Sequence, residues 1–333
     1  MRPGFIAAFA ILALALSGCG DGATANTSRI RVALARSPYT YLPVYLAEPL
    51  GFYRDENLSV TLEEFPGGAK AVEAVVGGSA DIAAGFYEHA IQMTAEGRPF
   101  RAFVTMLRYP GMALVVSEKA SRRIARIEDL KNATVGVGTP GSPTHFYLNY
   151  LLASHGLKPT DVAVVGIGAP AAAAAAVEHG TVDAAVVGGA LVILQRRQPR
   201  LVVLAESFSP EGVRQSLQVD EYPGATLLAP TAWLQRNVLA AQRMTRAILR
   251  TLDWIHGHNP DQIRQELPPA YRTDEDTDLR SLRLFLPLFS RDGRMRGVSA
   301  AAAQRVLAVS VDKVRDSRIN LEQTYTNDFL PVP

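Results

Sequence analysis

The chain has 333 residues, with 34 Lys or Arg against 32 Asp or Glu, so its formal net charge is only +2. This balance argues against a nucleic-acid-binding protein, and a hydrophobic content of 48% argues against a disordered one. The single cysteine excludes a disulfide framework, a thiolate zinc site and an iron–sulfur cluster. The length suggests about two domains of roughly 150 residues each.

The first residues have the pattern of an export signal. Met1 and Arg2 form a short positive region, an apolar run follows over 5–16, and small residues precede Cys19. The apolar run is too short to span a bilayer comfortably. We therefore expect residues 1–18 to be a signal peptide.

The only cysteine lies at the end of that signal. The tetrad Leu16-Ser17-Gly18-Cys19 resembles a bacterial lipobox, in which the thiol takes a diacylglyceryl group and becomes the new first residue. The alternative is a plain secretory signal with an incidental cysteine. Two or more acyl chains anchor a protein without a transmembrane helix, and residues 19–28 would form the lipidated flexible tether. The mature protein would then be periplasmic, in the cell envelope and held to a membrane.

From Arg29 onward, short apolar runs alternate with helix-period stretches, a pattern typical of parallel strands joined by crossover helices. After Thr231 the pattern is almost wholly helical, so we expect an α/β fold with a helical tail. The expected strands lie at about 30–35, 58–65, 81–85, 101–107, 112–117, 134–138, 162–167, 183–188, 201–205 and 224–228. The expected helices lie near 42–54, 68–78, 87–96, 144–155, 170–179, 189–197, 238–257 and 300–314.

A weak internal repeat predicts two similar lobes. The run from Gly78 to Ala84, GSADIAA, is echoed by GTVDAAV from Gly180 to Val186, and each copy follows an Ala- and Val-rich helix. In both copies glycine can end the helix in the left-handed conformation, and a buried strand of small residues follows. Chance similarity in a chain rich in Ala and Gly is the alternative.

Residues suited to ligand contact follow several predicted strands. Ligands bind outside the carboxyl ends of strands in open α/β sheets, so these loops are candidate sites. The loop after the first strand holds Tyr39 and Tyr41, and the loop after the third holds Phe86 and Tyr87. Ordinary packing in the core is an equally good explanation for any one of these aromatic side chains.

The segment from Gly141 to His145 predicts a helix start. Ser142 is a good N-cap and Pro143 suits the first turn, so the amides of Thr144 and His145 would point out of the helix. Such a terminus binds a carboxylate, sulfonate or phosphate group. The alternative is that Ser142 only caps its own helix.

Motifs of catalysis and of metal binding are missing from the sequence. It contains no Gly-x-Ser-x-Gly elbow, no P-loop and no His-Glu-x-x-His pair. His256 and His258 are a possible metal pair, but a polar end to a long helix explains them better. We interpret Arg122-Arg123 and Arg196-Arg197 as solvated surface pairs. We therefore expect no catalytic residue, no metal and no cofactor.

Several further motifs, taken in order, resemble the periplasmic substrate-binding proteins of ABC importers, in the nitrate, sulfonate, taurine and thiamine-precursor group. The resemblance covers almost all of the chain after the signal. It rests on these segments: Ala47–Tyr53, Glu56–Val60, Gly67–Ala69, Val76–Ile82, Ile127–Lys131, Val135–Val137, Gly141-Ser142, Leu151-Leu152, Gly156-Leu157 and Gly180–Ala185.

This resemblance implies a type II periplasmic binding protein fold, in which mixed sheets flanked by helices form two lobes around the ligand and the chain crosses between them twice. Lobe 1 would comprise 29–111 plus 222–333, and lobe 2 would comprise 112–221. The residues that it implies as ligand contacts are Tyr39, Tyr41, Phe86, Tyr87, Ser142, Thr144, His145, Gly189 and, on the second crossing segment, Tyr222.

One departure from the family pattern bears on the ligand. The pyrimidine-forming and pyrimidine-binding relatives carry a cysteine run in the second-lobe loop, where this chain has Thr139-Pro140-Gly141-Ser142. That difference argues against thiamine-precursor chemistry. The run Phe86-Tyr87-Glu88-His89 is bulkier than the small residues of many anion binders, so the hypothesis includes an aromatic or larger ligand.

The leading hypothesis is a monomeric, lipid-anchored solute receptor. It would capture a small organic anion and deliver it to the permease and ATPase subunits of an ABC importer. The first alternative is an enzyme on the same scaffold, similar to menaquinone-pathway relatives, with Glu88 or His145 as acid or base. The second is a lipoprotein that senses a ligand and reports it to a membrane kinase.

Overall fold

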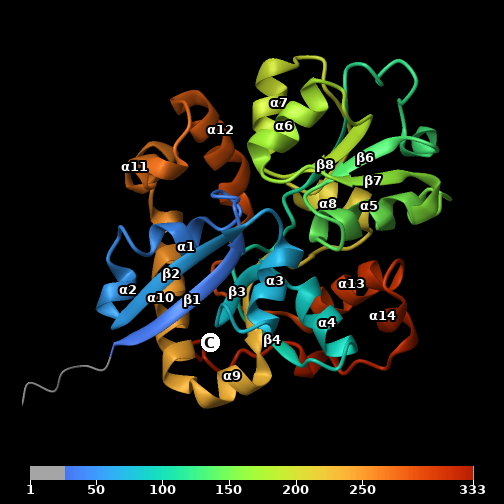
Figure 1. The fold of residues 1–333 in the computed structure, drawn as a ribbon. Helices are drawn as coiled ribbons and strands as arrows, with labels where there is room; N and C mark the ends of the chain where they lie inside the picture. Colours follow the sequence, from blue (N-terminus) through green and yellow to red (C-terminus); the bar gives the residue numbers. More distant parts are fainter. Residues whose placement is uncertain (1–26, 333) are drawn as a thin grey trace, which may run out of the picture.

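The computed structural model describes residues 27–332, which form two lobes (Figure 1). The expected signal peptide, the expected lipidation site Cys19 and most of the expected tether lie outside the described residues. Each lobe is built on one five-stranded sheet with helices packed on its faces. We use lobe 1 for the part built on the sheet that contains the first strand, and lobe 2 for the part built on the other sheet.

Lobe 1 is a mixed sheet of strand order β2-β1-β3-β10-β4, in which β10 alone runs antiparallel to its neighbours. Its strands are β1 (Ser28–Ala35), β2 (Leu58–Phe65), β3 (Ile82–Phe86), β4 (Phe100–Thr105) and β10 (Ala225–Pro230).

Lobe 2 repeats that plan with strand order β7-β6-β8-β5-β9, and here β5 is the antiparallel strand. Its strands are β5 (Ala113–Val116), β6 (Thr134–Val137), β7 (Ala163–Gly166), β8 (Ala184–Val187) and β9 (Val202–Glu206).

The expected α/β fold class and all ten expected strands are confirmed. The direction of two strands differs from a purely parallel pattern, because β5 and β10 are entered from segments that cross between the lobes rather than from crossover helices. Each lobe therefore receives one strand that runs against its neighbours.

The expected helices are present, with two of them divided. The stretch expected at 42–54 is broken at Gly51, whose φ of 76° is left-handed, and the stretch expected at 300–314 also forms two helices. The helices are α1 (Leu42–Leu46), α2 (Phe52–Asp55), α3 (Gly68–Val76), α4 (Glu88–Ala95), α5 (Pro143–Ser154), α6 (Pro170–Glu178), α7 (Ala190–Arg197), α8 (Pro210–Leu217), α9 (Thr231–Arg236), α10 (Val238–Gly257), α11 (Pro260–Glu266), α12 (Glu275–Phe285), α13 (Gly297–Ala308) and α14 (Asp312–Asp316). None of these described helices is long and apolar enough to cross a membrane.

Helix α8 was not among the expected helices. Its start carries a readable signal, because Ser209 accepts a hydrogen bond from the Gly212 amide and Pro210 occupies the first turn. Because α8 is short and lies between β9 and β10, it contributes little to the apolar pattern from which helices are predicted.

The internal repeat corresponds to two structurally equivalent strand entries. Asp81 lies before β3 and accepts a hydrogen bond from the Arg31 amide at 2.8 Å, and Asp183 lies before β8 and accepts one from the Thr134 amide at 2.8 Å. Each aspartate also donates its own amide to the carbonyl of the same partner residue. The repeat therefore marks where each lobe joins its third parallel strand to its first, which chance similarity does not explain.

Two segments cross between the lobes and pair with each other. One joins β4 to β5 over residues 106–112, and the other joins α8 to β10 over residues 218–224. The Gly224 amide donates to the Leu107 carbonyl at 2.9 Å, the Tyr222 amide donates to the Arg108 carbonyl at 3.3 Å, and Arg108 forms an ion pair with Glu221. The lobes are thus joined by two crossing segments that are hydrogen-bonded to each other.

Substituting Gly224 tests this pairing. A Cβ atom at Gly224 would lie 2.8 Å from the Tyr109 carbonyl oxygen, whereas Gly257 at the end of α10 has nothing within 4 Å of its Cβ position. We expect Gly224→Ala to lower the free energy of unfolding by about 1–3 kcal/mol, because the backbone must shift. Gly257→Ala is the control, and equal urea midpoints for the two variants would contradict the assignment.

Candidate functional site

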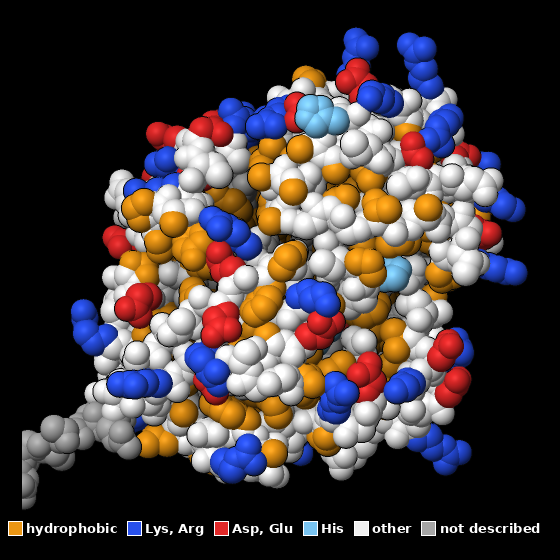
Figure 2. All heavy atoms as spheres, in the orientation of Figure 1, with side chains coloured by type: hydrophobic (Ala, Val, Ile, Leu, Met, Phe, Trp, Pro, Cys, Tyr) orange, Lys and Arg blue, Asp and Glu red, His pale blue; other side chains and the backbone are white. Residues whose placement is uncertain are grey.

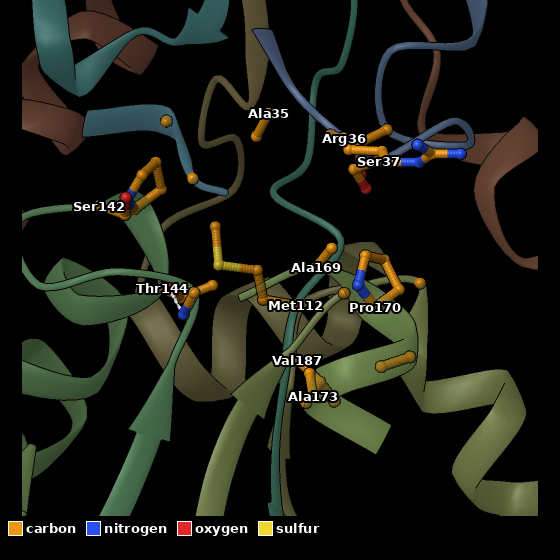
Figure 3. A pocket seen from close by; sticks show the side chains of 18 of the residues that line it. Ala35, Arg36, Ser37, Met112, Ser142, Thr144, Ala169, Pro170, Ala173 and Val187 are labelled. Carbon is orange, nitrogen blue, oxygen red and sulfur yellow. Dashed lines mark hydrogen bonds between the residues drawn. The ribbon is translucent and has the colours of Figure 1, made fainter. Parts of the chain in front are cut away.

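A cavity lies between the two lobes and beside the first crossing segment (Figure 3). It encloses about 110 Å³ within an open cleft of about 740 Å³. The enclosed part is smaller than the roughly 300–1,000 Å³ typical of sites for drug-sized ligands, so it suits a small solute. Apolar side chains in its wall include Tyr41, Phe86, Met112, Ile167 and Ala173.

The topology explains why the cavity forms here. The parallel strands of both sheets end at the cleft, and the loops that leave them supply its wall. From lobe 1 come the loops after β1, β2 and β3, and from lobe 2 come the loops after β6, β7 and β8. The cavity is therefore the meeting place of six strand ends.

Four helices begin at this cavity. Helices α3, α5, α6 and α7 start at Gly68, Pro143, Pro170 and Ala190, and all four of these residues line it. The first amides of a helix have no acceptor within that helix, and the helix dipole adds positive potential at this end. No side chain at the four N-cap positions accepts a hydrogen bond from its own helix. Pro143 and Pro170 carry no amide N–H, so the positive potential at these starts comes from the helix dipoles and from the amides that follow the prolines.

Ser142 holds the two lobes together at one edge of the cavity. It occupies the N-cap position of α5, but its Oγ accepts a hydrogen bond from the Ala69 amide of α3 at 3.1 Å and lies 2.5 Å from the Thr139 hydroxyl. A Cβ atom at Gly67 would lie 2.5 Å from Thr139 Oγ1, so only glycine fits this approach. The alternative that Ser142 caps its own helix is wrong, since its hydroxyl serves the other lobe.

The nearby Thr144 and His145 shape the loop that precedes α5. Thr144 lines the cavity and its Oγ1 accepts a hydrogen bond from the Gly138 amide at 2.9 Å (Figure 3). His145 does not line the cavity, and its Nδ1 accepts a hydrogen bond from the Gly141 amide at 3.0 Å. Burial lowers the pKa of His145 below its ordinary value, because the charged ring loses its hydration.

Among the described residues that line the cavity, Arg36 alone carries a charge. Its guanidinium points toward the rim (Figure 3), where it forms an ion pair with Glu64 at 3.4 Å and lies over the Tyr271 ring. Arg36 belongs to the loop after the first strand, which the sequence indicates as a candidate site, but it was not among the expected ligand contacts. The apolar lining residues Met112, Ile167 and Ala173 were also missed, since their types give no sign of a ligand role.

The expected ligand contacts divide into two groups. Five of them line the cavity: Tyr41, Phe86, Ser142, Thr144 and Gly189. Four others do not line it: Tyr39, Tyr87, His145 and Tyr222.

The three tyrosines of the second group have partners behind the cavity wall. The Tyr39 hydroxyl donates to Asp278 at 2.6 Å, and the Tyr222 hydroxyl donates to Glu88 at 2.8 Å. The Tyr87 hydroxyl contacts that of Thr324. These aromatic residues support the loops that form the wall.

Glu88 and Tyr222 form a buried pair that links α4 to the second crossing segment. Glu88 Oε1 accepts the Tyr222 hydrogen bond, and Oε2 has no hydrogen-bond partner among the described residues. Burial raises the pKa of Glu88 to about 7, because the charged form loses its hydration. Neither Glu88 nor His145, the acid or base of the enzyme hypothesis, lines the cavity.

The two histidines considered as a metal pair have other contacts. His256 Nε2 lies 3.1 Å from the Ser290 carbonyl oxygen, and His258 Nδ1 lies 2.7 Å from that of Trp254. Within residues 27–332, no group of three or more His, Cys, Asp or Glu side chains is arranged to hold a metal ion.

Comparison with known proteins gives a family and a fold. A family model described as "NMT1/THI5 like" matches residues 39–263. A solved structure from Bordetella bronchiseptica RB50 is 31% identical with a TM-score of 0.86, and the match covers 91% of this chain and 96% of that one. The alkanesulfonate-binding protein SsuA from Xanthomonas axonopodis pv. citri, solved with MOPS bound, has a TM-score of 0.67 at 18% identity, covering 87% and 94%.

Two curated relatives are more distant in sequence. Bacillus subtilis YtlA, which carries the name of a binding protein, is 24% identical over 84% of this chain and 80% of its own length. The 4-amino-5-hydroxymethyl-2-methylpyrimidine phosphate synthase of Candida albicans is 24% identical over 72% of this chain and 71% of its own length. The matched relatives thus include both a binding protein and an enzyme.

The buried carboxyl of Glu88 predicts a pH dependence of stability. Its pKa is raised by burial from about 4.5 to about 7, so between these pH values the native state keeps a proton that the unfolded state releases. The contribution of Glu88 to the free energy of unfolding therefore falls as pH rises through this window and levels off above it. Glu88→Gln can still accept the Tyr222 hydrogen bond and removes this titration.

We expect urea unfolding to show that Glu88→Gln gains stability relative to the unsubstituted protein between about pH 5 and about pH 8. Glu211→Gln, on an exposed face of α8, is the matched control and should show no such gain. Parallel stability curves for Glu88→Gln and the unsubstituted protein would contradict the assignment.

Proposed function

Because the chain belongs to the NMT1/THI5-like family, we propose that it is the solute-binding receptor of an ABC importer and that its solute is a small organic anion. The observation that carries the proposal is the convergence of four helix N-termini on one cavity between two lobes. Backbone amides at such termini bind carboxylate, sulfonate and phosphate groups.

The wall of the cavity favours an anion with an apolar body. Met112, Ile167 and Ala173 offer no hydrogen bonds to a highly hydrated ion, while the helix starts offer amide donors. A short alkyl or aryl sulfonate or carboxylate combines both features. The cavity volume of about 110 Å³ favours a small solute.

We propose that Tyr41, Phe86, Ser142, Thr144 and Gly189 contact the solute directly, since they line the cavity. Ligand contacts shared between the lobes favour the closed state, because a ligand shifts such an equilibrium only by its differential affinity. Tyr39, Tyr87, His145 and Tyr222 would act behind the wall by fixing its loops.

The partners of this receptor belong to the same proposal. We propose that it acts as a monomer, that acyl chains on Cys19 hold it to a membrane outside the cytoplasm, and that the closed form docks on the permease and ATPase subunits of the importer. The expected division into lobes at about residues 111 and 221 belongs to the same proposal, with the crossing segments as the hinge.

Catalysis is a second candidate function, favoured by the similarity to a pyrimidine phosphate synthase. It has less support, because Glu88 and His145 do not line the cavity and the loop at 139–142 carries no cysteine. Mass spectrometry of solutes recovered from the purified protein separates the two functions. A chemically altered solute would favour the enzyme.

A panel of solutes tests the proposed receptor. We expect at least one alkyl or aryl sulfonate or carboxylate to raise the unfolding temperature, since a ligand at about 100 times its Kd stabilises the native state by about 2.7 kcal/mol. Matched neutral alcohols and amines are the controls. Stabilisation by the amines alone would contradict the anionic class.

A charge placed in the cavity tests its electrostatic character. Ala173 lies in the first turns of α6 and lines the cavity, so Ala173→Asp adds a carboxylate where the solute anion would lie. We expect the affinity for the anion to fall at least about tenfold, because like charges a few ångströms apart repel strongly. Ala173→Asn has nearly the same shape without the charge and should retain more affinity. Equal losses for the two variants would argue against an anionic solute.

A further inference from the structure

Helix α12 runs beside the cleft and touches both lobes. Its carboxyl end lies near the crossing segments, where the Phe285 ring packs against Phe208 of lobe 2 at 5.3 Å and against Tyr39 of lobe 1 at 6.3 Å. Its amino end reaches α7 of lobe 2 (Figure 1). With 11 residues, α12 spans about 16 Å from the crossing segments toward the far end of α7.

Arg196, in the last turn of α7, holds the amino end of α12. Its Nη1 lies 2.7 Å and 2.8 Å from the two carboxylate oxygens of Asp274, and its Nε lies 2.9 Å from Asp276. Asp274 is also the N-cap of α12, because its side chain accepts the Thr277 amide at 3.1 Å. One arginine of lobe 2 therefore binds two carboxylates at a fixed helix start.

The same helix is fixed to the loop that follows β1. Asp278 is fully buried and accepts hydrogen bonds from the Tyr39 hydroxyl at 2.6 Å and from Arg264 Nε at 2.9 Å. Tyr39 belongs to the loop that carries the cavity residues Ser37, Thr40 and Tyr41. The amino end of α12 is thus hydrogen-bonded to the loop that forms one wall of the cavity.

Helix α7 completes the connection from the other side. It begins at Gly189 and Ala190, which line the cavity, and it ends at Arg196. The seam between α7 and α12 is an open groove of about 800 Å³ whose lining includes Arg280 and Arg283. Acidic and basic side chains lie side by side where α12 meets α7 (Figure 2). Since this groove is open to water, these ion pairs rather than a packed apolar interface join the two helices at this point.

We propose that Arg196 is a positioning residue for solute capture: its ion pairs with Asp274 and Asp276 form a clasp that holds the lobes closed without touching the solute. This inference rests on the proposed receptor function. Arg196 itself does not line the cavity. Its effect is on the balance between open and closed lobes, which sets how long a bound solute stays.

The neighbouring Arg197 provides a matched control. It lies on the same helix turn and is more exposed, and it pairs with Glu178 of α6 at 2.9 Å, within lobe 2. Replacing Arg197 removes one charge and one ion pair of the same helix without affecting a contact between α7 and α12.

The test measures lobe closure and solute release separately. Spin labels on Asp253→Cys of α10 and Lys131→Cys of lobe 2, in a Cys19→Ser chain, report the distance between the lobes without any solute. We expect Arg196→Ala to shift this distribution to longer distances and Arg197→Ala to leave it unchanged. Raising NaCl to about 0.5 M should lengthen the distances in the unsubstituted protein and have little effect on Arg196→Ala.

A double-mutant cycle distinguishes the clasp from a general loss of stability. Asp276→Asn, which leaves the Asp274 N-cap in place, should lengthen the distances in the otherwise unsubstituted protein and have little further effect in Arg196→Ala. With the tightest-binding sulfonate or carboxylate of the panel, Arg196→Ala should release solute about fivefold faster, because exposed pairs contribute about 0.2–1 kcal/mol each.

Equal distance distributions for Arg196→Ala and Arg197→Ala, or an undiminished effect of Asp276→Asn in the Arg196→Ala background, would overturn the clasp. Failure of every solute to bind would overturn the proposed function instead, and the distances in the solute-free protein would still test the clasp.

Discussion

The carboxyl ends of the parallel strands in the two sheets face each other, and this constraint determines where the rest of the site lies. Because each of those strands is followed by a loop and usually a helix, the helix starts of both lobes converge on one space. The glycines and small residues at these starts let backbone amides, rather than long side chains, form the polar part of the wall. The close approach of Gly67 to Thr139 shows how little room is left between the lobes at that edge.

Much of the fold could be predicted from the sequence, because the strands are short apolar runs and the two repeats mark equivalent entries into the sheets. Asp81 and Asp183 identify those entries, because each follows the glycine that ends a helix and precedes a run of small apolar residues. The division at Gly51 and the helix after Ser209 were less visible, since both depend on short segments. The antiparallel strands β5 and β10 could not be recognised as such, because direction depends on how the chain crosses between lobes.

The candidate site was predictable in its loops and less so in its side chains. Tyr41 and Phe86 line the cavity. Tyr39 and Tyr222 are aromatic residues of the same kind, but Tyr39 is hydrogen-bonded to Asp278 and Tyr222 to Glu88. Those partners lie 239 and 134 residues away along the chain, so nothing local indicates them. Arg196 illustrates the same difficulty: a pair of arginines at a helix end has the pattern of a solvated surface, and only the position of α12 distinguishes its two members.

Strand β10 follows lobe 2 in the chain but belongs to the sheet of lobe 1, and this affects the order in which the two lobes can fold. All five strands of lobe 2 are present once the chain has been made as far as Glu206. In lobe 1, β4 pairs in its sheet only with β10, which is not complete until Pro230. When the chain is synthesised from its amino end, the sheet of lobe 2 can therefore be completed first. Until β10 has been made, the edge of β3 has no strand beside it. The lobe whose synthesis begins first is therefore the lobe whose sheet is completed last.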